Sequence, residues 1–298
     1  MRKTSEIDNA PSPATNGRAS TLRMRKNAIG VRLLSRTTRG VAPTEPGSTR
    51  YNLQRNMLRV GACQTPEILG DIEAALACIE RFAKQSESAH VDLLLFPECF
   101  LQGYLVEEGH VRRHALDLES AAFAFILQRL TRVRPTLVVG MIELLAGRYF
   151  NSAVVIRSGQ VVGVYRKTHL SAGESLFEPG GAFPVFELNG VTYGINICFD
   201  TNVADAAAPL AAQGARLMLV PAQNMMKRGA AEEWKLLHNR IRAERVRETG
   251  MWLVSADVTG ARDDLRVAYG PTCVMNSEAA VVAQVPLMTT GMVLAEIE

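Results

Sequence analysis

The sequence lacks both long apolar runs and paired cysteines. No run approaches the roughly 18 to 20 residues that a helix needs to cross a bilayer, so the 298 residues predict a soluble protein with no membrane partner. The five cysteines lie far apart and form no CxxC pair. An odd number at such spacing fits a reducing compartment, here the cytoplasm, better than a disulfide framework, and it matches no zinc-finger spacing. We therefore expect no metal site.

A strong charge of one sign is also absent from most of the chain. The net charge is +3, from 33 Lys+Arg and 30 Asp+Glu, but residues 1–57 contain 11 of the basic residues and 3 of the acidic ones. The remaining residues carry a small acidic excess. Charge therefore gives no support to nucleic-acid binding by the folded part.

Residues 1–57 are rich in Arg, Ser, Thr, Pro, Gly and Asn and show no sustained apolar period. This composition predicts a disordered basic extension. Two interpretations of the segment stay open. The stretch from Arg18 to Arg39 has no acidic residue and loosely matches an organelle transit peptide, so organelle targeting is compatible with the sequence. Alternatively, translation begins at Met57.

From Leu58 onward, strand and helix patterns alternate. Apolar residues in 71–85 recur at the spacing of an amphipathic helix, and 91–98 is a continuous apolar run typical of a strand buried on both faces. Ser158-Gly159 and Asn189-Gly190 predict the turns of two β-hairpins. Further strands are expected at 58–64, 136–145, 215–222, 251–258 and the end of the chain, and further helices at about 123–130 and 232–249. The helix at 232–249 is expected to face inward with Trp234, Leu237 and Ile241. We predict one α/β domain over 58–298.

Three polar residues stand where apolar runs end, namely Glu98, Lys167 and Cys198. Ligands bind at strand ends in open α/β sheets, and a charge beside an apolar run needs a partner or a function. Each residue also has a structural interpretation when it is taken singly. A cysteine among apolar neighbours is more often a core residue than a nucleophile, and Glu98 and Lys167 could be solvated.

The combination of the three favours chemistry. A carboxylate with a raised pKa can take the proton of a thiol. An ammonium group and a backbone N–H can stabilise the oxyanion that forms when sulfur attacks an amide or nitrile carbon. The same carboxylic acid can return its proton to a leaving amine. Cys, Glu and Lys together therefore suffice for acyl transfer through a thioester, without a cofactor.

Three stretches, "LLLFPECFLQGY", "YRKTHL" with "GESLFEPGG", and "GINICFD", resemble the signature blocks of the nitrilase superfamily, the carbon–nitrogen hydrolases. The similarity covers nearly all of 58–298, with the blocks in the family's order. The resemblance implies an α/β fold in the form of a four-layer α-β-β-α sandwich. It also implies a Cys-Glu-Lys triad, in which Cys198 is the nucleophile, Glu98 the general base and acid, and Lys167 the oxyanion-stabilising cation.

The resemblance gives weaker expectations for five further residues. Glu174 is the best match to a second glutamate that positions the triad, with a solvated loop glutamate as its alternative. Phe199 would supply its backbone N–H to the oxyanion. Tyr104 and Asn224 are expected to line the substrate pocket or to have structural roles. Asp200 is expected to hold the turn after Cys198. The other four cysteines, Cys63, Cys78, Cys99 and Cys273, are interpreted as packing thiols.

The residues after Cys198 bear on the substrate. True nitrilases tend to have Trp-Glu there, whereas this sequence has Phe-Asp, which favours the amidase and carbamoylase branch. An arginine that could bind a substrate carboxylate is missing from "DTNVADAAAPLAAQGA". We expect a thiol hydrolase of the non-peptide C–N bond of a small amide, assembled as a homodimer or larger homo-oligomer. The alternatives are a nitrile hydrolase and a non-catalytic or regulatory member of the same fold.

Overall fold

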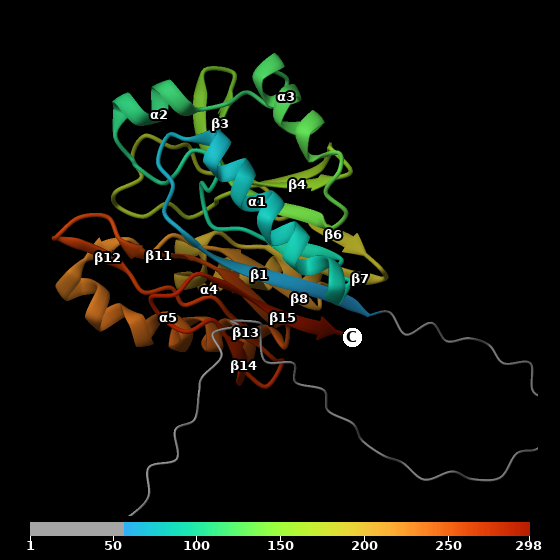
Figure 1. The fold of residues 1–298 in the computed structure, drawn as a ribbon. Helices are drawn as coiled ribbons and strands as arrows, with labels where there is room; N and C mark the ends of the chain where they lie inside the picture. The colour runs from blue at the N-terminus through green and yellow to red at the C-terminus, as the bar shows by residue number, and fades with distance from the viewer. Residues whose placement is uncertain (1–56) are drawn as a thin grey trace, which may run out of the picture.

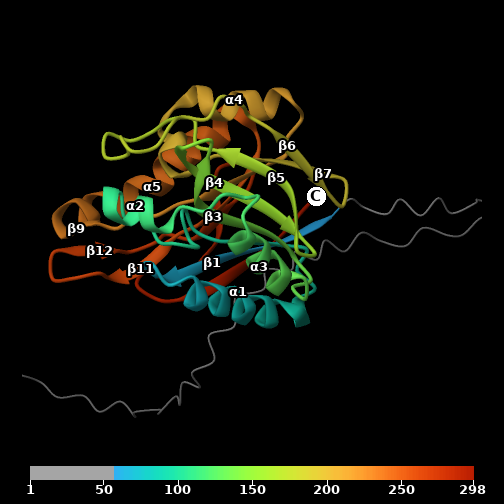
Figure 2. The same cartoon turned by 90° about the horizontal axis from the view of Figure 1, so that it is seen from above.

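The computed structural model describes residues 57–298, so the predictions for residues 1–56 lie outside the described part of the chain. Two β-sheets lie face to face between two layers of helices (Figures 1 and 2). No helix within 57–298 combines the length and the apolar character that crossing a membrane requires.

The first sheet has nine strands, in the order β5-β4-β3-β2-β1-β11-β12-β9, with β15 also paired to β1. Its strands are β1 (Leu58–Pro66), β2 (Leu93–Leu95), β3 (Thr136–Leu145), β4 (Arg148–Arg157), β5 (Gln160–Arg166), β9 (Met226–Lys227), β11 (Val258–Ala261), β12 (Arg266–Ala268) and β15 (Gly291–Ile297). The first and last strands are antiparallel neighbours, with Leu58 opposite Ile297. This pairing closes the domain on itself.

The second sheet has six strands, in the order β14-β13-β10-β8-β7-β6. They are β6 (Val185–Leu188), β7 (Val191–Ile195), β8 (Leu217–Pro221), β10 (Trp252–Ala256), β13 (Cys273–Met275) and β14 (Val281–Gln284). Strands β7, β8 and β10 are parallel neighbours. Their carboxyl ends therefore lie together at one edge, which is where ligands bind in α/β sheets.

The main core lies between the two sheets. Alternate residues of each strand point into it, as the two-residue period of a strand requires. Val60 and Leu95 come from the first sheet, and Ile195, Leu219 and Val254 come from the second; all five have no exposed surface.

The helices form the two outer layers. Helix α1 (Ile72–Ser86) and helix α3 (Ala121–Leu130) pack on the first sheet, and helix α4 (Ala204–Ala212) and helix α5 (Arg228–Thr249) pack on the second. Figure 2 shows α1 and α3 on one side of the sheets and α4 and α5 on the other. This arrangement confirms the four-layer α-β-β-α sandwich. Short helices lie at α2 (Glu108–His114), η1 (Glu87–Ala89) and η2 (Cys198–Asn202).

Both predicted hairpins are confirmed. Ser158 and Gly159 have φ of 50° and 73°, and Asn189 and Gly190 have φ of 52° and 74°. Two successive residues with positive φ match the right-handed twist of the flanking strands in a two-residue turn. The turns connect β4 to β5 and β6 to β7.

Three expectations about elements differ from the structure. The apolar run 91–98 contains a strand of only three residues, because the chain leaves the sheet before Pro97, which has no N–H to donate. The run 251–258 is two strands in different sheets, divided at Asp257. Helix α5 begins at Arg228 rather than near residue 232.

Helix α5 also differs from expectation in the face that it buries. Trp234, Leu237 and Ile241 were expected to face inward, but they are only half-buried. The buried residues of α5 are Ala231, Arg242, Ala243, Arg245 and Val246. Since Trp234 and Ile241 line a cavity, their apolar side chains serve that cavity rather than the core.

Candidate active site

A cavity of about 270 Å³ lies where the strand ends of the two sheets meet, and six of the seven predicted site residues line it. These six are Glu98, Tyr104, Lys167, Cys198, Phe199 and Asn224. A larger cavity of about 360 Å³, between Ser86 and Leu188, contains none of them. Within residues 57–298, no cluster of three or more His, Cys, Asp or Glu side chains is arranged to hold a metal ion.

The side chains that could react lie just after the ends of strands. Glu98 follows β2 in the first sheet, and Cys198 and Asn224 follow the parallel neighbours β7 and β8 in the second. The Glu98 N–H donates to the carbonyl of Ala222, so the loop after β2 contacts the loop after β8. Lys167 follows β5. The predicted grouping of Glu98, Lys167 and Cys198 in one cavity therefore results from the sheet topology.

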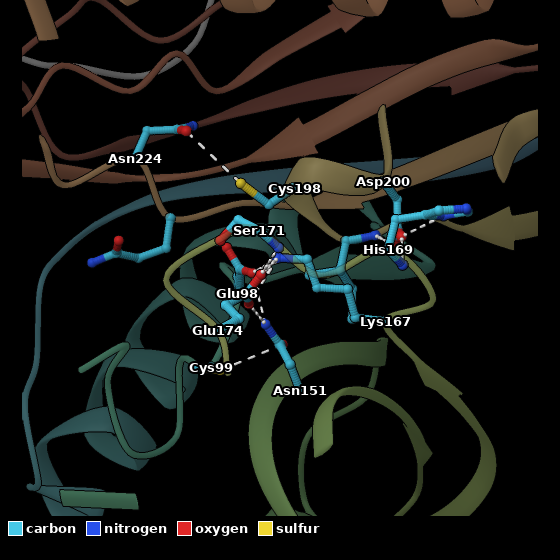
Figure 3. Close-up of polar contacts among 12 residues, drawn as sticks. Glu98, Cys99, Asn151, Lys167, His169, Ser171, Glu174, Cys198, Asp200 and Asn224 are labelled. Carbon is cyan, nitrogen blue, oxygen red and sulfur yellow. Dashed lines mark hydrogen bonds and ion pairs between the residues drawn. The ribbon is translucent and has the colours of Figure 1, made fainter. Parts of the chain in front are cut away.

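The Lys167 ammonium lies between two carboxylates. Its Nζ is 2.7 Å from Glu98 Oε1 and 2.9 Å from Glu174 Oε1 (Figure 3). The three side chains are 1%, 1% and 0% exposed. Glu174, which was expected either beside the triad or in solvent, is thus buried in direct contact with Lys167. Its other oxygen accepts the Ser171 N–H at 2.8 Å, which fixes the loop that carries it.

Asn151 in β4 completes this cluster, and the sequence reasoning missed it. Its Nδ2 donates to Glu98 Oε1 at 2.7 Å and to Glu174 Oε1 at 2.9 Å, and its Oδ1 faces the Cys99 thiol at 3.4 Å. The side chain is 1% exposed. The available signal was an amide inside the strand "YFNSAVVI", because a buried amide needs polar partners.

The pKa values in the cluster differ in direction. Burial raises the pKa of Glu98 to about 7, although Lys167 opposes the shift. Burial also acts to lower the pKa of Lys167, but the negative charge of Glu98 and of its other neighbours outweighs it, so the net shift is well upward. For Glu174, burial is outweighed by Lys167 and by hydrogen bonds, and the pKa falls. Near neutral pH, Glu98 is the member that can gain or lose a proton.

Cys198 stands at a strained turn. Its φ is 43°, in the left-handed region that residues other than Gly, Asn and Asp rarely adopt, and it is the first residue of η2. It is the one partly exposed cysteine among the five, all of which are free; the other four are buried, as expected for packing thiols. Withdrawal from water, followed by the charge of Glu98, raises the pKa of the Cys198 thiol well above its ordinary value. The thiol is therefore protonated at rest.

Asp200 holds this turn, as the resemblance implied. Its Oδ2 accepts the Ile197 N–H at 2.8 Å and the Tyr165 hydroxyl at 2.7 Å. Its Oδ1 accepts the Thr168 hydroxyl at 3.1 Å and the His169 N–H at 2.8 Å. One carboxylate thus joins the segment after Lys167 to the segment that presents Cys198, and it keeps the cation and the thiol in a fixed relation.

Asn224 is oriented by a buried carboxylate. Asp257, which follows β10, accepts hydrogen bonds from the Asn224 backbone N–H at 3.1 Å and from its side-chain Nδ2. This leaves Asn224 Oδ1 toward the Cys198 thiol, at 3.8 Å from Sγ. Asp257 is fully buried, and burial raises its pKa to about 6 although Arg242, 3.8 Å away, opposes the shift.

A second ion pair, between Arg262 and Glu67, stabilises the rim of the cavity. Arg262 contacts both oxygens of Glu67, at 2.7 Å and 2.5 Å. Glu67 also accepts from Gln223 at 2.6 Å, and Arg262 donates to the carbonyl of Tyr104 at 3.2 Å. Tyr104 and Gln223 both line the cavity. The pair therefore fixes two loops that enclose it.

Gly140 in β3 supplies the first test of this geometry. A Cβ at this position would overlap the backbone of Pro97 and Cys99, on either side of Glu98. We expect Gly140→Ala to cost about 2 kcal/mol of stability and to lower kcat as well, because the loop that carries Glu98 must move. Thermal unfolding and turnover of the same preparation would measure both.

Gly61→Ala is the matched control. There the new Cβ would be 2.7 Å and 2.9 Å from the flexible side-chain ends of Leu94 and Met292. We expect a stability loss with turnover per folded molecule unchanged. Equal losses of kcat in both variants would show that the effect of Gly140→Ala does not come from a displaced Glu98.

Comparison with known proteins identifies a family and several relatives. Residues 59–298 match the family described as Carbon-nitrogen hydrolase. An (R)-stereoselective amidase from Pseudomonas sp. is 29% identical over 225 residues, which are 75% of this chain and 71% of the amidase. A nitrilase from Pyrococcus abyssi is 28% identical over 249 residues, 81% of this chain and 90% of the nitrilase.

A third relative is longer than this chain. The glutamine-dependent NAD(+) synthetase of Rhodobacter capsulatus is 28% identical over 216 residues, and the match spans 38% of its length. Among solved structures, an amidase mutant from Nesterenkonia sp. AN1 has a TM-score of 0.70 at 21% identity, covering 81% of this chain and 93% of that one. That structure shows the result of Michael addition of acrylamide at the active-site cysteine.

Proposed function

The chain belongs to the carbon–nitrogen hydrolase family, and we propose that it hydrolyses the non-peptide C–N bond of a small amide through a thioester on Cys198. One observation carries the proposal. A partly exposed thiol shares a cavity with a buried carboxylate whose pKa is raised to about 7 and with a lysine whose pKa is raised above its ordinary value. A base that is half ionised near neutral pH beside a fixed cation is what acyl transfer to sulfur requires.

The acylation half of the reaction follows from these groups. The Glu98 carboxylate takes the Cys198 proton as sulfur attacks the carbonyl carbon. The Lys167 ammonium and the Phe199 N–H stabilise the resulting oxyanion. When the C–N bond breaks, the nitrogen takes the proton from Glu98 and leaves as ammonia or an amine, and the acyl group remains on Cys198 as a thioester.

Deacylation uses the same carboxylate a second time. Glu98 takes a proton from a water molecule that attacks the thioester carbon, and the protonated Glu98 returns that proton to the departing sulfur. The net change is amide plus water to acid plus amine. Asn151 contacts Glu98 and Glu174 contacts Lys167, and neither residue lines the cavity. We therefore assign Asn151 and Glu174 the role of positioning Glu98 and Lys167.

Several observations support an amide over the alternatives. The Phe-Asp pair at 199–200 favours the amidase branch, and the Pseudomonas relative is an amidase. The Pyrococcus relative keeps a nitrile hydrolase as the second candidate. A non-catalytic member would have no need for a buried Lys167 with two carboxylates, because burying charges is costly without a function. Assembly into a homo-oligomer and a cytoplasmic location remain predictions.

Covalent trapping and a substrate panel test the proposal. Acrylamide should add once per chain, at Cys198, as read by intact mass and peptide mapping. Small amides should release ammonia and the matching acid, and acid quench should leave an acyl group on Cys198. Consumption of nitriles with amides inert would favour the nitrile hydrolase. An unreactive Cys198 together with an inert panel would favour the non-catalytic member.

A further inference from the structure

One part of the cavity wall has no role in the proposed chemistry. Trp234, His238 and Ile241 are spaced i, i+4 and i+7 on α5 and therefore lie on one face of that helix. Met225 and Met226, which follow Asn224, line the cavity with them. We call these five residues the apolar wall. They present aromatic, branched and thioether surface to the cavity that contains Cys198.

The histidine of the apolar wall does not contribute a positive charge. The rings of Trp234 and His238 are 5.4 Å apart between centroids. Burial, followed by the charge of Arg242, lowers the pKa of His238 to about 3, so the imidazole is neutral at physiological pH. It therefore contributes an uncharged ring beside the indole ring.

The two cations that line the cavity are both already paired. Lys167 contacts Glu98 and Glu174. Arg242 is 3.8 Å from Asp257 and donates to the carbonyl of Pro271 at 2.8 Å. These two cations face three buried carboxylates. A negative charge on the acyl part of a substrate would lose its water there without gaining an unpaired cation among the lining residues.

We propose that the substrate is an amide with an uncharged, branched or aromatic acyl group, which binds against the apolar wall. This inference rests on the proposed function for the reaction, and on the apolar wall for the kind of acyl group. The cavity volume of about 270 Å³ is close to the lower end of small-molecule sites. The acyl group is therefore small, with room for a few carbon atoms or one ring.

An isosteric pair of amides tests the proposal. Isovaleramide and malonamate differ in that an isopropyl group replaces a carboxylate of similar shape. With the full chain, we expect kcat/KM to be at least roughly 100-fold higher for isovaleramide, and glutamine to be a poor substrate. Equal or faster hydrolysis of malonamate or glutamine would overturn the inference and point to Arg242 as a carboxylate receptor.

Variants of α5 locate the specificity. Trp234→Ala, and separately Ile241→Ala, should lower the ratio of kcat/KM for isovaleramide to that for acetamide by about tenfold, mainly through KM. Leu236→Ala is the matched control, because Leu236 is on the same helix but 74% exposed. Its ratio should equal that of the unchanged protein. An unchanged ratio in both cavity variants, with folding verified by circular dichroism, would contradict the proposal.

Binding to Cys198→Ala separates this inference from the proposed function. Calorimetric titration needs no turnover, and isovaleramide should bind more tightly than malonamate. If no amide is hydrolysed but this preference is seen, the proposed reaction is wrong and the binding inference stands. If the variant binds neither compound, or prefers malonamate, the inference is wrong whatever the reaction.

Discussion

Replacing Cys198 by alanine is expected to lower kcat/KM for the preferred amide by about 10⁴-fold or more, which is typical of removing a covalent nucleophile. The reason is geometric. Within residues 57–298, Cys198 is the only partly exposed cysteine, and it shares its cavity with Glu98 and Lys167. No other described thiol can take over the attack. Steady-state ammonia release with the unchanged and variant proteins would measure the effect.

Two controls make this loss interpretable. Cys78→Ala removes a buried thiol from α1, outside the cavity, and should leave turnover intact. Cys198→Ser keeps the size of the side chain but gives a poorer nucleophile, so it should also lose most activity while folding normally. Full amide turnover by Cys198→Ala would exclude the thioester route and leave the cavity with a different reaction.

Local patterns predicted the elements whose residues are neighbours in sequence. The buried residues of α1 recur every three or four positions, and two-residue turns at Ser158-Gly159 and Asn189-Gly190 define their hairpins. The four-layer arrangement came from the resemblance to the nitrilase superfamily, since periodicity cannot assign a strand to a sheet. The division of 251–258 at Asp257 shows this limit, because a stretch predicted as one strand supplies strands to both sheets.

The residues of the site likewise fall into those that could be predicted from local sequence and those that could not. The predicted triad residues stand next to apolar runs, where a charge or thiol is conspicuous in sequence. Their partners are distant in sequence and become neighbours only through folding. Asn151 reaches Glu98 from a position 53 residues away, and Asp257 reaches Asn224 from 33 residues away. Trp234 and Ile241 of α5 were expected to face inward, but they line the cavity, because an apolar stripe has the same spacing whether it faces a core or a cavity.

Glu98→Gln is expected to lower kcat by 10²- to 10⁴-fold, the usual contribution of a general base. In the unchanged protein, kcat/KM should rise with pH through an apparent pKa near 7, because the carboxylate is active only when ionised. Glutamine cannot titrate, so the variant should lose this limb of the profile. Glu119→Gln, at an exposed position, is the matched control and should keep both the rate and the limb. A limb that persists in Glu98→Gln would assign it to another group, with Asp257 the next candidate because its pKa is about 6.

Glu98→Gln should also raise the free energy of unfolding at neutral and alkaline pH. Because the folded-state pKa of Glu98 is raised from 4.5 to about 7, the unfolded chain loses this proton more readily than the folded one. The contribution of Glu98 to the free energy of unfolding is therefore fully present below pH 4.5. It is lost as the pH rises through 7, and the total loss is about 3 kcal/mol. Glutamine stays neutral and avoids that loss, so denaturant unfolding should show the variant gaining on the unchanged protein between pH 5 and pH 8. A variant that loses stability relative to the unchanged protein over this range would contradict this expectation. It would mean that the attraction between the Glu98 carboxylate and Lys167 stabilises the fold by more than burial of the carboxylate destabilises it.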